Sequence, residues 1–385
     1  MPLIVVDARG ITFRPSGART RLLGLYSALA EAPGPLEFVV VVSQGRRARE
    51  ICHARNIPCI ESPPERVGRK LFSGFRLTGD PFRWADIIHR ETYPVPIDQP
   101  QPTVLTIHDL RSSADRSMAT TPMKSFYERR LLPLAAKRLA RLVAVSETTA
   151  REIVHYLRVR QDRLVVVPNA IDPPDLSSED LAHPLKGERF MLAFGHMEPR
   201  KNLPALLPAM QAASRDGNFP VRNLVVAGRD FGEAERLRAQ MNKTTNPGFQ
   251  LHILTEVDDE LRESLLHHAD CLLAPSRLEG FGLVPLEAMI RDTPALVSDI
   301  PAAREVLGDG ALYFNPDEPE SLANIMQTIV DNPDARKQLD LAGRQVLEKY
   351  SWKHSARILR STYQTILGLS EEHTDARISS RPTGS

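Results

Sequence analysis

The stretch CLLAPSRLEGFGLVPLEAM, residues 271–289, joins a short apolar run, a turn with two glycines and the start of a helical pattern. The apolar run is typical of a buried parallel strand, and Pro285 suits the first turn of a helix, where its missing N–H is not needed. Gly280 and Gly282 let a ligand approach the backbone closely. The stretch therefore predicts a strand, a glycine turn and a helix start whose free amide groups favour an anion.

The same unit recurs along the chain, because short β-branched runs alternate with helix-period stretches such as 20–31 and 123–140. The expected strands are 3–7, 38–43, 86–89, 103–108 and 142–146, then 190–195, 223–228, 249–254, 271–275 and 295–298. Strand, helix, strand at this spacing predicts the α/β class, with two Rossmann-like doubly wound domains. Ligands of such sheets bind beyond the carboxyl ends of the strands, so we expect a cleft between two facing domains.

A change of composition indicates the domain boundary. The segment 165–188 leaves a strand and enters a stretch rich in Pro, Ser and Asp that cannot hold a helix. We expect a first domain at 1–175 and a second at 176–350. For 351–369 we expect a C-terminal helix, and one arrangement open to this helix is to pack back on the first domain. The polar residues 370–385 lack periodicity and are expected to form a disordered tail.

Composition excludes several classes of protein. The 385 residues are 42% hydrophobic and 25% charged, which is typical of a soluble globular protein. No apolar run is long enough to span a membrane, and the N-terminus has no basic leader. Three cysteines without a C-x-x-C pair favour a reducing cytoplasm over a disulfide frame or a zinc site.

Charge is unevenly distributed. Residues 1–175 hold 26 Lys and Arg against 18 Asp and Glu, and the remainder holds 23 against 30. The basic half indicates an anionic partner, either a lipid surface or a phosphorylated acceptor. The alternative is that its arginines lie on helix faces that contact only solvent. The basic segment 124–141 has two interpretations: a helix in peripheral contact with an anionic membrane at its inner face, or a helix packed on its own sheet. We expect no nucleic-acid partner.

Two glutamates flank the glycine turn of 271–289. A carboxylate repels a phosphate, so Glu279 and Glu287 are better suited to accept hydrogen bonds from the hydroxyls of a sugar and a ribose. A diphosphate between two such rings is a nucleotide sugar. The alternative is a structural glycine turn with a favourable glutamate in the first helical turn.

The segment EGFGLVPLEAM resembles the E-x7-E signature of the retaining glycosyltransferases of the GT-B fold, family four (group 1). Together, TIHDL and EPRKN resemble the mannosyl- and rhamnosyltransferase-like members. The resemblance extends over nearly the whole chain. Other matching segments are DARGITFRPSGARTR (7–21), TIHDL (106–110), AVSETT (144–149), VVVPNAID (165–172), FGHMEPRKNL (194–203), 295–323 and 350–359.

The resemblance implies a role for particular residues. The first domain would hold the acceptor and the second the nucleotide sugar. The implied catalytic residues are His108, Arg200, Lys201 and Glu279, and the implied donor-binding residues are Gly17, Phe281, Gly282, Leu283 and Glu287. Arg200 and Lys201 would neutralise the diphosphate and the charge of the departing nucleotide.

Some positions depart from the family pattern. Arg19 stands where a second glycine often falls, His196 stands where arginine is common, and RDTP (291–294) replaces CGTP. The chain has no Asp-x-Asp, so we expect no metal and no cofactor, with the nucleotide sugar as co-substrate. No pair of carboxylates of the kind that glycosidases use is evident, which favours front-side attack over a covalent intermediate.

Other functions stay open at this stage. A sugar-nucleotide epimerase and a glycan phosphorylase share related folds, but the two glutamates argue against the first and no pyridoxal lysine context supports the second. A protein of another class, a non-catalytic nucleotide-sugar sensor or partner subunit, would keep the same binding residues. We favour a hexosyltransferase that acts on a glycan or a lipid-linked acceptor in surface polysaccharide synthesis.

Overall fold

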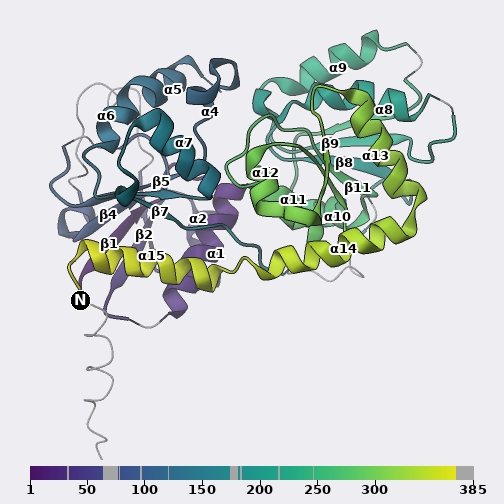
Figure 1. Ribbon diagram of the computed structural model, residues 1–385. Helices are drawn as coiled ribbons and strands as arrows, with labels where there is room; N and C mark the ends of the chain where they lie inside the picture. The colour runs from purple at the N-terminus through teal and green to yellow at the C-terminus, as the bar shows by residue number, and fades with distance from the viewer. Residues whose placement is uncertain are drawn as a thin grey trace, which may run out of the picture.

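The structure is a computed structural model that describes residues 1–32, 34–63, 77, 79–95, 98–119, 121–173, 181–182, 184–215, 217–245 and 247–369. Within these residues the chain forms two lobes side by side, each built on a β-sheet (Figure 1). The predicted α/β class with two Rossmann-like domains is confirmed. The tail expected at 370–385 lies outside the described residues, as does much of the linker, so the exact domain limits stay predictions.

The first sheet has seven strands in the order β3-β2-β1-β4-β5-β6-β7, and all the pairings are parallel. Its strands are β1 (Leu3–Asp7), β2 (Glu37–Ser43), β3 (Cys59–Ser62), β4 (Ile87–Arg90), β5 (Thr103–Ile107), β6 (Arg141–Ala144) and β7 (Leu164–Val166). The order reverses at β1, whose neighbours are β2 and β4. Such a switch point opens a crevice at the carboxyl ends of the strands.

The second sheet has six strands in the order β10-β9-β8-β11-β12-β13, also parallel throughout. Its strands are β8 (Phe190–Phe194), β9 (Asn223–Ala227), β10 (Gln250–Leu254), β11 (Cys271–Ala274), β12 (Ala295–Ser298) and β13 (Leu312–Phe314). Here β8 and β11 lie at the switch point. The loops that follow these two strands therefore begin next to each other.

Every run expected to form a strand does so, within one or two residues. The pattern missed β3 and β13, each of which lies at the edge of its sheet. Most residues of these two strands are only partly buried. β3 carries Glu61 and Ser62 and β13 is only three residues long, so neither has the long apolar run that marks the buried strands.

Helices cover both sheets (Figure 1). In the first lobe they are α1 (Gly17–Glu31), α2 (Arg46–Ala54), α4 (Arg111–Ala114), α5 (Pro122–Phe126), α6 (Leu132–Ala136) and α7 (Glu147–Leu157). In the second lobe they are α8 (Leu206–Ala213), α9 (Glu233–Lys243), α10 (Asp259–His268), α11 (Leu283–Met289), α12 (Pro301–Leu307), α13 (Pro319–Asp331) and α14 (Pro333–Glu348). Across the described part of the chain, no helix has both the length and the apolar character that crossing a bilayer requires.

The single helix expected at 123–140 is wrong in detail. The chain forms α5, a π-helical turn at Tyr127–Leu131 and α6, and the helix ends at Ala136. Pro133 is the physical reason, because it cannot donate to the carbonyl four residues earlier and its ring needs space there. Widening the preceding turn to the π form accommodates the ring without ending the helical run.

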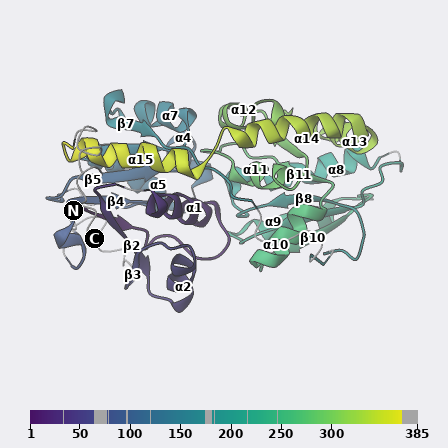
Figure 2. The same ribbon diagram turned by 90° about the horizontal axis from the view of Figure 1, so that it is seen from below.

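The last described helix, α15 (Trp352–Ile366), crosses back from the second lobe and runs along the first (Figure 1, Figure 2). Trp352, Leu359 and Tyr363 join the core that the first sheet forms with α1. A Cβ at Gly24 of α1 would overlap the indole of Trp352, so glycine is required for this close approach. Each such buried side chain contributes about 1.5–3 kcal/mol, which ties the two lobes together through the C-terminal segment.

Candidate active site between the two lobes

Two loops of the second lobe meet at the carboxyl ends of β8 and β11. The first carries Arg200 and Lys201 and the second carries Glu279. The amide of Arg277 donates to the carbonyl of Arg200 at 2.9 Å, which joins the loops directly. Strand order therefore explains why residues nearly eighty positions apart lie together.

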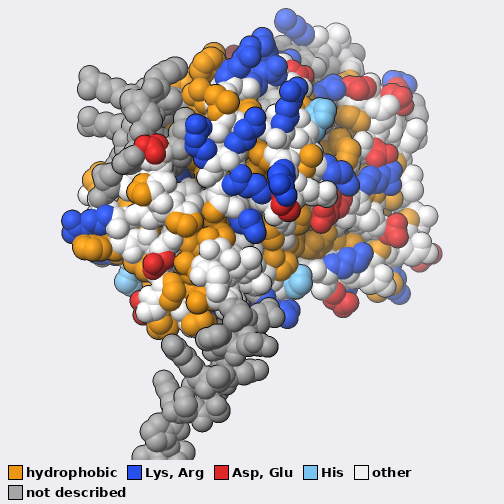
Figure 3. All heavy atoms as spheres, turned by 60° about the vertical axis from the view of Figure 1, so that its left-hand side comes forward, with side chains coloured by type: hydrophobic (Ala, Val, Ile, Leu, Met, Phe, Trp, Pro, Cys, Tyr) orange, Lys and Arg blue, Asp and Glu red, His pale blue; other side chains and the backbone are white. Residues whose placement is uncertain are grey.

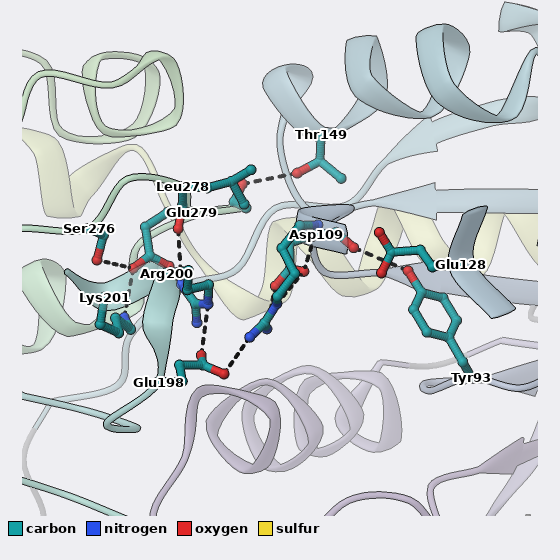
Figure 4. Close-up of polar contacts among 12 residues, drawn as sticks. Tyr93, Asp109, Glu128, Thr149, Glu198, Arg200, Lys201, Ser276, Leu278 and Glu279 are labelled. Atoms are coloured by element: carbon teal, nitrogen blue, oxygen red, sulfur yellow. Dashed lines mark hydrogen bonds and ion pairs between the residues drawn. The ribbon is translucent and has the colours of Figure 1, made fainter. Parts of the chain in front are cut away.

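Glu279 lies at the centre of this site (Figure 4). Its carboxylate accepts hydrogen bonds from Arg200 Nη1 at 2.6 Å, Lys201 Nζ at 2.6 Å and Ser276 Oγ at 2.7 Å. Burial raises the pKa of Glu279, but the charges of Arg200 and Lys201 outweigh it and hold the pKa at about 2. The carboxylate is therefore ionised at neutral pH. Ser276 was not anticipated from the sequence.

A chain of ion pairs continues from Arg200 into the first lobe. Arg200 Nε donates to Glu198 Oε1 at 2.7 Å, and Arg111 Nη1 donates to Glu198 Oε2 at 2.5 Å. Arg111 in turn donates to both oxygens of Asp109, at 2.8 and 2.6 Å. Burial raises the pKa of Asp109, yet the Arg111 guanidinium holds it well below its usual range. Sequence reasoning missed Arg111 and Glu198, which stand three residues from His108 and two residues from Arg200.

His108 follows β5 in the first lobe, and its side chain is about one third exposed. His108 Nε2 lies 3.1 Å from the main-chain carbonyl oxygen of Glu91. A carbonyl oxygen can only accept, so Nε2 carries the proton and Nδ1 is left as an acceptor in the neutral ring. Burial lowers the pKa of His108, which favours this neutral form at pH 7.

The glycine turn touches the first lobe. A Cβ at Gly280 would collide with the carbonyl oxygen of His108, so only glycine fits there. Gly17, the first residue of α1, lies opposite the turn, since a Cβ on it would be 3.2 Å from Leu283 Cδ1. The structure thus places Gly17 and His108 beside the turn, and their implied roles stay predictions.

A hollow of about 660 Å³ lies along this turn. Its lining includes Lys201, Glu279, the backbone around Gly282 and the loop after β8. Phe281 is only 4% exposed and packs edge-on against Tyr350 at 5.2 Å, so its side chain belongs to the core. Gly282 has φ of +87°, a conformation that favours glycine, and caps the seven-residue helix α11.

Glu287 faces a different hollow, of about 860 Å³, between α1 and the second lobe. The side chain is 4% exposed, and Glu287 Oε1 pairs with Arg262 Nη2 at 2.7 Å. Across this hollow Arg19 donates to both oxygens of Asp259, at 2.7 and 3.1 Å. Arg19 therefore links α1 to α10 between the lobes.

Two other sequence features have defined surroundings. His196 lines the hollow beside Glu279, and its ring lies 5.1 Å from that of Phe231. Burial lowers the pKa of His196 to about 4, so it supplies no positive charge at neutral pH. Within the described ranges no group of three or more His, Cys, Asp and Glu side chains could hold a metal ion.

Comparison with known proteins adds a family to this geometry. Residues 15–174 match the family model described as Glycosyltransferase Family 4, and residues 179–346 match the one described as Glycosyl transferases group 1. The chain is 31% identical to the O-antigen chain mannosyltransferase RfbU of Salmonella typhimurium, over 60% of this chain and 62% of that protein. It is 29% identical to a phosphatidyl-myo-inositol mannosyltransferase of Mycobacterium tuberculosis, over 69% of this chain and 68% of that one. The match therefore spans less than two thirds of the Salmonella protein.

Solved structures share the fold at lower identity. The Anabaena protein Alr3699/HepE, crystallised with UDP and glucose, has a TM-score of 0.72 at 17% identity and covers 95% of this chain and 100% of its own. Sucrose-phosphate synthase from Thermosynechococcus elongatus has a TM-score of 0.69 at 15% identity, with 96% and 100% coverage. These likenesses show the common two-lobed architecture.

Proposed function

This chain belongs to the glycosyltransferases of group 1 and family 4, which have the GT-B fold, and we propose that it transfers a hexose from a nucleotide sugar to a glycan or a lipid-linked acceptor. The proposed hexose is mannose, since RfbU and the mycobacterial relative are mannosyltransferases by name. The proposed setting is surface polysaccharide synthesis. The observation that carries the proposal is the contact of Glu279 with Arg200 and Lys201 beside the glycine turn.

The donor would exchange partners with this cluster. Arg200 and Lys201 now neutralise Glu279, and a diphosphate would take over their positive charges. Glu279 would then be free to accept hydrogen bonds from hydroxyls of the sugar. His108 Nδ1 would offer a second acceptor from the opposite wall. Glu287 would accept from the ribose in the neighbouring hollow, where Arg262 now satisfies it.

The proposed reaction retains the configuration of the sugar and needs no metal. As the bond between the anomeric carbon and the phosphate oxygen breaks, negative charge grows on the phosphate, and the fixed cations Arg200 and Lys201 stabilise it. Among the residues that line the hollow beside the glycine turn, Glu279 supplies the carboxylate. The low pKa of Glu279 makes this carboxylate a weak base. In the proposed front-side attack the departing phosphate therefore accepts the proton of the acceptor hydroxyl, while that hydroxyl oxygen bonds to the anomeric carbon.

The first test is thermal unfolding of the full chain with UDP, GDP, ADP and dTDP, each with and without EDTA. A nucleotide at 100 times its Kd stabilises the folded chain by about 2.7 kcal/mol. We expect one nucleotide to raise the Tm, equally in EDTA. The matching nucleotide sugar is then incubated with and without acceptor, and the anomeric configuration of the product is read by NMR. Nucleotide binding without transfer or donor hydrolysis would instead support a non-catalytic sensor or partner subunit.

We also propose that the α5–α6 region contacts an anionic membrane, which would bring a lipid-linked acceptor to the cleft. Its apolar side chains Met123, Phe126 and Leu134 are 48%, 47% and 53% exposed. Exposed basic residues lie among them, namely Lys124, Arg129, Arg130, Lys137 and Arg138. Figure 3 shows Lys and Arg side chains gathered near hydrophobic ones on this side of the molecule. Interfacial segments combine these two kinds of side chain.

Flotation with vesicles tests the membrane proposal. We expect the chain to float with phosphatidylglycerol-containing vesicles more than with pure phosphatidylcholine vesicles. Changing Met123, Phe126 and Leu134 together to serine should abolish flotation. The matched control is Leu341→Ser, since Leu341 is 55% exposed on α14 of the other lobe. Equal flotation of the triple variant and the control would contradict the proposal.

A further inference from the structure

The segment AVSETT (144–149) has no part in the chemistry described so far, yet it makes direct contact with the glycine turn. It spans the end of β6 and the start of α7. Ser146 Oγ donates to the carbonyl oxygen of Gly280 at 2.5 Å. Thr149 Oγ1 donates to the same oxygen at 3.1 Å (Figure 4). Both side chains are 1% exposed or less. Two buried hydroxyls of the first lobe therefore converge on one carbonyl of the second.

The protons of these hydroxyls are accounted for. Ser146 is the N-cap of α7 and accepts from the amide of Thr149 at 3.0 Å, so its single proton is free for another acceptor. Two oxygen atoms lie within reach of the Ser146 hydroxyl proton. The carbonyl oxygen of Gly280 is closer to Ser146 Oγ than Thr149 Oγ1, which lies at 3.1 Å, so we assign the proton to the carbonyl. Ser146 thus caps the start of a helix in its own lobe and donates to the opposite lobe with the same oxygen atom.

A second contact joins the same helix to the second lobe. The carboxylate of Glu305, on α12, accepts from the amides of Glu147 and Thr148 at 2.7 Å each and from Thr148 Oγ1 at 2.6 Å. A carboxylate at a helix N-terminus is favourable because it meets free amides and the positive end of the dipole. We call Ser146, Thr149, Glu305 and Gly280 the interdomain cluster.

The interdomain cluster acts on Glu279 through the backbone. The Glu279 carboxylate is held by Arg200, Lys201 and Ser276, all in the second lobe. The next residue, Gly280, is held from the first lobe by the two hydroxyls and packs against the carbonyl of His108. The position of the Glu279 backbone relative to its carboxylate is therefore set by contacts from both lobes.

We propose that Ser146 and Thr149 are positioning residues for hexose transfer: by holding Gly280 they align Glu279 with the donor sugar when the two lobes are docked. The inference rests on the proposed function of Glu279. The predicted phosphate and ribose contacts, Arg200, Lys201 and Glu287, lie in the second lobe. Loss of the two hydroxyls should therefore reduce transfer and leave nucleotide affinity unchanged.

Thr149→Val is the variant that tests this, because it keeps the shape and removes the hydroxyl. Thr149→Ser keeps the hydroxyl and should therefore keep the kcat of the unaltered chain. The matched control is Thr293→Val, since Thr293 is 1% exposed and donates to the carbonyl of Leu266 within the second lobe. In Thr149→Val we expect kcat to fall roughly three- to tenfold, as for one lost hydrogen bond, with the nucleotide Kd within about twofold. Thr293→Val should leave kcat unchanged.

Hydrogen exchange of the amides in 279–284 supplies a readout that does not need activity. We expect faster exchange there in Thr149→Val than in Thr293→Val or Thr149→Ser. Equal exchange in all variants overturns the proposal. Faster exchange with unchanged kcat also overturns it, since the contact would then be structural only. If the unaltered chain transfers no hexose, both the proposed function and the positioning role are wrong. Hydrogen exchange then still shows whether the two hydroxyls hold the glycine turn.

Discussion

Two clusters of charged residues differ in where they lie. The loop cluster, Glu198, Arg200, Lys201 and Glu279, has side chains that are 3–16% exposed and stands at the carboxyl ends of strands. The core cluster, Arg21, His89 and Glu91 with Tyr26 and Tyr363, has side chains exposed by 1% or less. Both contain acids beside bases, at 2.6–2.7 Å in the loop cluster and at 3.6–3.8 Å in the core cluster.

The core cluster joins elements of the first lobe. Tyr26 donates to Glu91 Oε1 at 2.6 Å, and the hydroxyl of Tyr363 lies 2.5 Å from His89 Nδ1. Arg21 Nε lies 3.6 Å from Glu91 Oε2. These contacts join α1, α15 and the end of β4 in the buried interior of the first lobe. A charge there is costly to leave unpaired, so the cluster holds the fold together, whereas we propose that the loop cluster exchanges its partners for a substrate.

Glu91→Gln should have the largest effect and break the core cluster. It leaves the Arg21 guanidinium buried without a counter-charge, which costs about 3–5 kcal/mol. Denaturant unfolding measures the loss. Glu320→Gln is the control, because the ion pair of Glu320 with Arg215 is exposed and is worth about 1 kcal/mol or less. Equal losses in the two variants would show that burial does not distinguish the clusters.

Arg200→Ala should affect transfer rather than folding. Removing a cation from the place where the leaving charge grows lowers kcat by about 100- to 1,000-fold. Transfer kinetics and thermal unfolding are measured together. Arg277→Ala removes a neighbouring arginine whose ion pair with Asp317 is partly exposed, and should keep most of the activity. A collapse of the Tm in Arg200→Ala with little change in kcat would reverse the roles assigned to the two clusters.

Acid should weaken the loop cluster. The pKa of Glu279 is about 2 in the folded chain against an ordinary 4.5. A carboxyl group whose pKa is lowered by folding stabilises the folded chain at every pH above its pKa in the unfolded chain. This stability is lost as the pH falls from about 4.5 to 2. The slope should be roughly 1 kcal/mol per pH unit. Glu279→Gln should flatten this part of the stability curve, and parallel curves for the two proteins would contradict the ion pairs.

Tyr363→Phe should have the smallest effect. The substitution keeps the packing of α15 and removes only the hydroxyl beside His89 Nδ1. Loss of this one hydrogen bond costs about 1 kcal/mol of stability. Combining it with Glu91→Gln in a double-mutant cycle sharpens the comparison. Strict additivity of the two unfolding free energies would mean that α15 is not coupled to the buried carboxylate.

Much of the candidate site could be predicted from the sequence. Apolar runs predicted the central strands, and the rule that ligands lie beyond the carboxyl ends of strands predicted a cleft between two facing domains. Resemblance to a family identified the residues within those loops. The structure places Gly17, His108, Arg200, Lys201 and Glu279 around the glycine turn. The roles of these residues, and that of Glu287 in the second hollow, stay predictions until they are measured.

What the sequence determined by itself is local: which runs form buried strands, that Pro285 lies in the first turn of a helix, and where Gly282 permits a positive φ. Only the tertiary structure decided which groups pair across the lobes, such as Arg111 with Glu198, Arg19 with Asp259 and Ser146 with the carbonyl oxygen of Gly280. Periodicity and turn chemistry depend on neighbours along the chain. Pairing across the cleft depends instead on how two separately folded sheets dock, and no spacing within the sequence encodes that distance.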